Sequence, residues 1–113
     1  MSEEDKLIDR VIAVTESLTD VIQQENTLLK ERRPRDTIKL QAEKAKLTAT
    51  YGQELQTLKR QSQSVRQSHP QSLDRLRSVT DRFQETLAIH VRLVTTLKNV
   101  TENVIKQISD EVN

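Results

Sequence analysis

The residue types that enzymes use most often for chemistry are few in this sequence, and their spacing does not build a site. The chain has two histidines, His69 and His90, and no cysteine. His69 lies beside Pro70 in a polar stretch, and His90 has no carboxylate four residues away to act as a second metal ligand on one helical face. Serine is frequent, but no serine, histidine and acid occur with the turns and glycines of a nucleophilic site. We therefore expect no enzyme activity, no cofactor and no metal, and interpret His90 as a partly buried core residue.

Phosphate binding is the other chemistry to consider. The only glycine is Gly52, so a glycine-rich phosphate loop is excluded. Lys30, Arg32, Arg33 and Arg35 form a basic cluster that could contact phosphate, although a charged loop that keeps a helical hairpin soluble explains it better. Lys plus Arg (18) nearly balances Asp plus Glu (17), so no global field favours nucleic acid or an anionic membrane.

The elements that would position these residues are helices. Apolar residues recur at intervals of three and four in three stretches, which is the spacing of one helical face and unsuited to a strand. The three stretches are Leu7, Val11, Val14, Leu18, Val21 and Leu28, with Ile8, Ile22 and Leu29; Leu40, Leu47, Tyr51, Leu58 and Val65, with Leu55; and Leu73, Leu76, Phe83, Leu87, Val94, Leu97, Val104 and Ile108. The sequence predicts an all-α fold of three long amphipathic helices, an antiparallel hairpin plus a longer third helix in a coiled-coil-like bundle.

The helix boundaries follow from the prolines and from capping residues. We expect helices at about 3–33, 36–66 and 71–112 within a single domain, 1–113. Ser2 is the expected N-cap of the first helix, and Pro34 ends that helix because it lacks an amide donor. Ser68 and Gln71 have capping-box spacing ahead of the third helix, and Pro70 is tolerated in its first turn.

The register of the hairpin can be predicted from its turn. Residues that face each other should have numbers that add up to about 69, which places Leu18 near Tyr51. The same register brings Glu25, the charged residue on the first apolar face, opposite Lys44 on the second. Such a pair fixes register more than it adds stability. The alternative is that both charges are solvated on a wide groove.

The same reasoning for the second and third helices places Leu55 opposite Phe83 and Tyr51 opposite Leu87. It also predicts that residues 103–113 extend past the hairpin by roughly 15 Å. The expected partner-binding residues on this part of the third helix are Val94, Leu97, Val104, Ile105, Ile108 and Val112. An apolar face of this kind binds a partner, packs against a second copy, or frays in solution. Sequence alone does not decide whether the third helix folds back on the hairpin or extends to exchange with another chain.

Composition is typical of an elongated helical protein with a thin core. Hydrophobic residues make up 34% and charged residues 31%, with one Tyr, one Phe and no Trp. The acidic N-terminus lacks the basic start and apolar run of a signal peptide. No apolar stretch approaches the roughly 20 residues that span a bilayer. We expect a soluble cytoplasmic protein without membrane insertion.

The stretch Glu25 to Leu58 (ENTLLKERRPRDTIKLQAEKAKLTATYGQELQTL) resembles the FlgN family of flagellar export chaperones. The resemblance rests on an E-N-x-L-L run at the end of a first helix, a short break, and a K-x-x-L element, Lys44 to Leu47, in the second. It implies a cytoplasmic chaperone that binds the C-terminal helical segments of hook-associated proteins before export. The family's client-binding region is an amphipathic C-terminal segment, which matches the predicted overhanging face.

Two other functions compete with this expectation. A structural coiled-coil module would use the same apolar face for self-association, as a homodimer. An adaptor would use the arginine-rich turn to bind RNA or phospholipid, with a steep dependence on salt. The first reading, a non-enzymatic protein that binds an amphipathic helix, is the one we carry forward.

Overall fold

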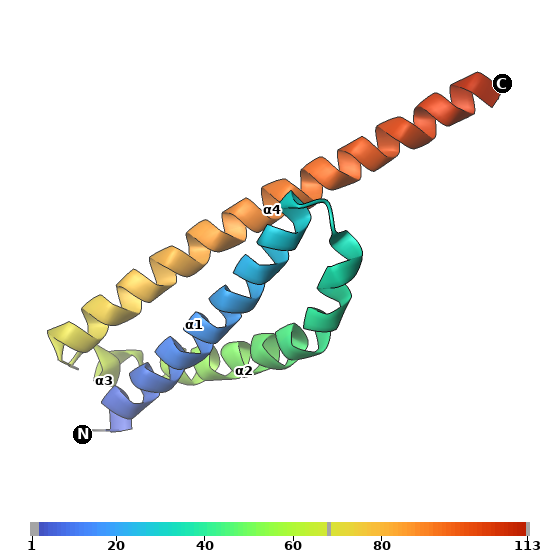
Figure 1. The fold of residues 1–113 in the computed structure, drawn as a ribbon. Coiled ribbons are helices and arrows are strands. Elements are labelled where there is room, and N and C mark those ends of the chain that lie inside the picture. Colours follow the sequence, from blue (N-terminus) through green and yellow to red (C-terminus); the bar gives the residue numbers. More distant parts are fainter. Residues whose placement is uncertain (1–2, 68, 113) are drawn as a thin grey trace.

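The computed structural model describes residues 3–67 and 69–112 and confirms the all-helical architecture (Figure 1). The elements are α1 (Glu3–Lys30), the 3₁₀ helix η1 (Pro34–Leu40), α2 (Gln41–Arg60), α3 (Ser62–Arg66) and α4 (Pro70–Val112). No strand occurs in these ranges. The two predicted caps, Ser2 and Ser68, lie outside the described residues.

The first helix, α1, is the centre of the molecule. It contacts α2 on one side and α4 on the other, and the buried core lies almost entirely on it (Figure 1). Its buried residues are Leu7, Ile8, Val11, Ile12, Val14, Thr15, Leu18, Thr19, Val21, Ile22, Glu25 and Asn26. The hydroxyl groups of Thr15 and Thr19 donate to backbone carbonyls four residues earlier, so these buried polar atoms are satisfied within the helix. By contrast, α2 has no buried residue.

A backbone capping motif ends α1 before the chain reaches Pro34, and the sequence analysis did not predict it. The Arg33 N–H donates to the Leu28 carbonyl at 2.8 Å, and the Arg32 N–H donates to the Leu29 carbonyl at 3.1 Å. Arg32 has a positive φ of 60°, so the arrangement is a Schellman motif with arginine where glycine is usual. The predicted end at Arg33 is therefore three residues too late, because the chain leaves the helical path before it reaches the proline.

The region predicted as a helix over about 36–66 is helical but divided into three elements. The segment begins as the 3₁₀ helix η1, becomes α2, breaks at Gln61 with φ −106° and ψ 23°, and resumes as the short α3. The break turns Val65 into a core cluster with Ile8 and Ile12. Val65 is the only strongly apolar residue in the polar run 59–71, so burying it requires the chain to bend.

The third helix, α4, runs parallel to α1. Residue numbers increase together in the pairs that join the two helices, from Arg75 with Asp9 (3.7 Å) to Thr86 with Asn26 (3.2 Å). It therefore folds back along α1 and then continues past its end, as the C-terminal part of α4 in Figure 1 shows.

The predicted register between the second and third helices is wrong by one helical turn. Tyr51 packs against Phe83, with ring centroids 5.2 Å apart, and not against Leu87, which is 38% exposed. The prediction placed Leu55 opposite Phe83 on the assumption of a simple hairpin between the two helices. Since α3 interrupts that connection, the hairpin rule does not hold there.

Candidate partner-binding site

One face of α4 holds the helix against the rest of the bundle. Its side chains are buried or half-buried and recur at intervals of three and four: Leu73, Leu76, Val79, Phe83, Thr86, His90, Leu93 and Leu97. Leu73, Leu76 and Val79 pack on the cluster that contains Ile8 and Ile12. The predicted spacing of three and four is therefore present on α4, and the side chains that follow it pack against α1.

The same face continues beyond the end of α1, where it is exposed. Val100, Val104 and Ile108 keep the spacing and are 53%, 48% and 56% exposed. We call residues 98–112 the overhang; every side chain from 98 to 110 is exposed, and no helix among the described residues covers it (Figure 1). At 1.5 Å per residue the overhang is about 22 Å long, somewhat longer than predicted, because α1 stops early.

The structure places the predicted partner-binding residues at different levels of α4. Val104, Ile105 and Ile108 lie exposed on the overhang, and Leu97 is half-buried where the overhang begins. Val94 is 44% exposed and lies beside the covered face of α4, before the overhang begins. The side chain of Val112 lies outside the described residues.

On α4, two exposed apolar residues were missed from the sequence. Val100 lies on the continuing face, and the 4-3-4 spacing of Leu93, Leu97, Val100 and Val104 could have identified it. Val91 is 56% exposed and lies with Leu87 and Ala88 on the flank of α4, where a shallow hollow is found.

A larger hollow lies at the junction where α1 ends and α4 continues. Its volume is about 560 Å³. The lining residues are Leu29, Lys30, Arg32, Pro34, Leu93, Thr96, Leu97 and Val100. Leucine and valine make up half of the lining residues, and the two cations come from the last turn of α1 and its Schellman motif. We refer to it as the junction hollow.

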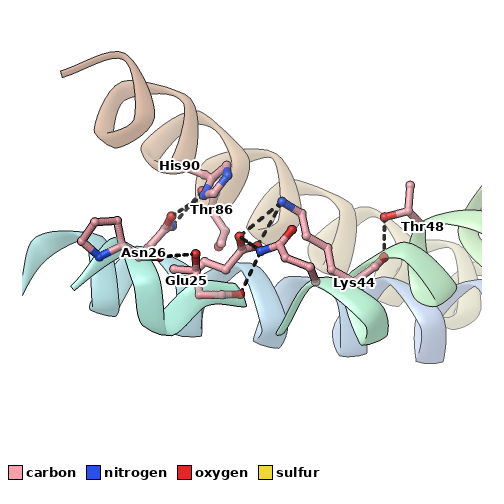
Figure 2. Close-up of polar contacts among 9 residues, drawn as sticks. Glu25, Asn26, Lys44, Thr48, Thr86 and His90 are labelled. Atoms are coloured by element: carbon pink, nitrogen blue, oxygen red, sulfur yellow. Dashed lines mark hydrogen bonds and ion pairs between the residues drawn. The ribbon is translucent and has the colours of Figure 1, made fainter. Parts of the chain in front are cut away.

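The predicted pairing of Glu25 with Lys44 is confirmed (Figure 2). Lys44 Nζ lies 3.1 Å from Glu25 Oε1, an ion-pair contact without hydrogen-bond geometry, and donates a hydrogen bond to Oε2 at 3.4 Å. Gln41 Nε2 also donates to Oε2, at 3.1 Å. Glu25 is only 4% exposed, so the alternative of two solvated charges is excluded.

A neighbouring polar group joins α1 to α4 at the same level (Figure 2). Asn26 Nδ2 donates to the Thr86 carbonyl at 3.2 Å, and Asn26 Oδ1 lies 2.9 Å from His90 Nδ1. Because Oδ1 can only accept, Nδ1 carries the proton of this hydrogen bond. Burial lowers the pKa of His90, the Glu25 carboxylate opposes that shift, and the Lys44 ammonium adds to it. His90 is thus a neutral structural residue at neutral pH, as the sequence indicated.

The site combines an exposed apolar face with a hollow that two cations line. Among residues 3–67 and 69–112, no group of three or more His, Cys, Asp or Glu side chains is placed to hold a metal ion. None of the described helices is long and apolar enough to cross a membrane. Comparison of the chain with protein-family models, with curated proteins and with solved structures found no match. The chemistry available is burial of apolar side chains beside fixed cations.

Proposed function

We propose that the chain is a non-enzymatic protein that binds an amphipathic helix of another protein on the overhang of α4. The observation that carries the proposal is the continuity of one face. The side chains that hold α1 between Leu73 and Leu97 continue as Val100, Val104 and Ile108 with no helix against them. A partner helix in line with α1 would extend the packing already present.

The expected affinity is moderate. Full burial of a Val, Leu or Ile side chain stabilises by roughly 1.5–3 kcal/mol. The exposed apolar residues of the overhang, Val100, Val104, Ile105 and Ile108, are each about half exposed, so together they contribute roughly 3–6 kcal/mol. Association also costs translational and side-chain freedom, so the overhang alone supports weak binding and a tighter complex needs a further contact.

The more specific form of the proposal is a cytoplasmic FlgN-type chaperone for the C-terminal helices of hook-associated proteins. It is supported by the resemblance over Glu25 to Leu58. In the structure, the E-N-x-L-L run and the K-x-x-L element meet, since Glu25 pairs with Lys44 and Leu29 lines the junction hollow. The residues that carry the resemblance thus shape the end of the hairpin from which the overhang extends.

A second candidate is self-association through the same face. It is favoured by the same exposed valines and isoleucines, because a second copy would bury them equally well. The two functions differ in the mass of the protein in solution.

Replacing Val104 and Ile108 with Asp tests the proposal. Two buried carboxylates would oppose docking of an apolar helix, so we expect affinity for a synthetic C-terminal helix of a hook-associated protein to fall at least 100-fold, as measured by calorimetry. The melting temperature should hardly change, since both side chains are exposed. The matched control is Val91→Asp with Thr95→Asp, which adds the same charges at the same spacing on another face of α4.

Each other outcome selects a different reading. Loss of the folded state in Val104→Asp/Ile108→Asp would show that the overhang packs into the core. Conversion of a dimer to a monomer with peptide binding intact would establish the structural module. Equal weakening by the control pair would place the binding surface on the flank of α4.

A further inference from the structure

We infer that the junction hollow receives a large apolar side chain from an acidic amphipathic helix of a partner protein, whose carboxylates pair with Lys30 and Arg32. This inference rests on the proposed function and specifies the partner that it would select. The hollow lies at the start of the overhang, so a helix that continues the line of α1 has its nearer end over it.

The floor of the hollow is suited to one bulky apolar group. Leu29 of α1 and Leu93 and Leu97 of α4 are half-buried there, and Val100, the first apolar residue of the overhang, also lines the hollow. The volume of about 560 Å³ is within the range of small-ligand pockets, so one aromatic or leucine side chain has ample room. Large residues in such pockets provide most of the binding energy at many interfaces. The hollow therefore supplies the further contact that the overhang needs.

The rim of the hollow carries positive charge without a partner. Lys30 and Arg32 line it directly, and Arg92 lines a smaller adjoining hollow together with Lys30. In the described ranges none of these three cations forms an ion pair. A partner that brings carboxylates to this rim would satisfy cations that the fold leaves unpaired.

The local acids are unable to neutralise the rim because another arginine holds them. Arg33 Nε donates to Asp36 Oδ2 at 2.6 Å, and its guanidinium also lies 3.4 Å from Glu31 Oε2. These contacts raise the pKa of Arg33, the Asp36 hydrogen bond most. The rim cations Lys30 and Arg32 therefore remain available to a partner.

The chemistry of the hollow selects against other occupants. A phosphate group would pair with Lys30 and Arg32 but would leave the leucine and valine floor uncovered, so nucleic acid and phospholipid headgroups use only part of the hollow. The overhang of a second copy carries mixed charge, with Lys98 3.9 Å from Glu102 and with Lys106 and Asp110 further along, so it matches the cationic rim less well than an acidic helix does. An acidic helix with an apolar anchor complements both the floor and the rim.

The test uses two synthetic helical peptides of about 20 residues, which span about 30 Å. Both carry an apolar face at 3-4 spacing and a Phe near one end; in one peptide the residues flanking Phe are Glu, and in the other Gln. We expect the Glu peptide to bind the full chain about tenfold more tightly at low salt, with the preference reduced at high salt. Fluorescence anisotropy of labelled peptides measures both affinities.

Matched variants locate the preference. Lys30→Gln with Arg32→Gln should abolish the difference between the peptides, whereas Lys46→Gln with Arg77→Gln, which removes two exposed cations elsewhere, should preserve it. Val100→Asp should weaken the Glu peptide at least about tenfold, and Val91→Asp, with nearly equal exposure (56% against 53%), should not.

The outcomes separate this inference from the proposed function. Equal binding of both peptides, with loss of both in Val104→Asp/Ile108→Asp, would overturn the acidic-partner inference and leave the proposed function standing. If the Glu peptide binds Val104→Asp/Ile108→Asp normally but does not bind Val100→Asp, the result would support the hollow and overturn the overhang as the main surface. Failure of both peptides to bind would overturn both. A doubling of mass that hides the hollow, seen by sedimentation, would assign it to a second copy.

Discussion

The polar residues between the helices fix how the helices meet. Glu25 and Lys44 are the charged residues in otherwise apolar faces, and the carboxylate is almost fully buried. A buried pair of this kind adds little net stability relative to apolar residues, but breaking it leaves a charge without compensation. The pair therefore fixes the register of the two helices and contributes little to the free energy of unfolding.

Charge reversal at these two positions should show this coupling. Glu25→Lys or Lys44→Glu alone places like charges together and should destabilise the fold by about 2–4 kcal/mol. The double reversal should recover part of that loss, since Gln41 can present its amide oxygen in place of its N–H₂ group, with a coupling energy of at least about 1 kcal/mol. Urea denaturation of the four proteins measures it. The same charge reversals at the exposed Lys98–Glu102 pair should give a coupling energy below about 0.5 kcal/mol. Equal coupling energies at the two pairs would contradict the role of Glu25 and Lys44 in fixing the register.

His90 should make stability depend on pH. Burial lowers its pKa below the ordinary value of 6.5, so just below that pH the folded chain binds fewer protons than the unfolded chain. The contribution of His90 therefore lowers the free energy of unfolding as the pH falls below 6.5, and His90→Gln should reduce the loss. His69→Gln is the control, because His69 is exposed. Urea denaturation above and below pH 6.5 measures the free energy of unfolding of each variant. If His90→Gln loses as much stability on acidification as the unaltered chain, another group is responsible.

At the scale of the elements, the single glycine is a weak point in α2. A Cβ added at Gly52 would meet nothing within 4 Å among the described residues, so close approach of another helix does not account for this glycine. Gly52→Ala should then raise the free energy of unfolding by about 1 kcal/mol by restricting the unfolded chain. Ala49→Gly on the same helix should lower it by a similar amount in the same urea titration. A loss of stability in Gly52→Ala would indicate that α2 needs its flexibility to bend.

The sequence predicted those elements whose causes are local. Apolar spacing and the two prolines were sufficient for three helical regions, and complementary charges were sufficient for Glu25 opposite Lys44. The break at Gln61 was not predicted, because its cause is the distant core around Ile8 that captures Val65. The register between α2 and α4 was predicted one turn away from the observed one, because α4 packs along α1, which is remote in sequence. An overhang was predicted because the third helical stretch is the longest, although its start was counted from a register that the structure corrects. The junction hollow was not predicted, since it depends on the Schellman motif at Arg32.

At the scale of the whole molecule, the chain is a short bundle with a rod attached. Its extents are 67 × 22 × 22 Å, and α4 accounts for the long dimension. The core that stabilises the fold lies on α1, whereas the exposed apolar residues are concentrated on the distal half of α4. The residues that stabilise the fold and the residues proposed to bind a partner therefore lie at different positions along the long axis. The apolar face can be exposed there without destabilising the core.

A chain truncated after Lys98 tests this separation. It retains every residue that packs on α1, including Leu93 and Leu97, so the melting temperature should change by no more than a few degrees, as calorimetry or circular dichroism would measure. It should lose binding of the amphipathic peptides, because Val100, Val104 and Ile108 are removed. Scattering in solution should show a shorter particle than the full chain, whose radius of gyration is 18.9 Å. If the truncated chain unfolds, the distal half of α4 is needed to stabilise the bundle, and the division between a stable core and a binding rod fails.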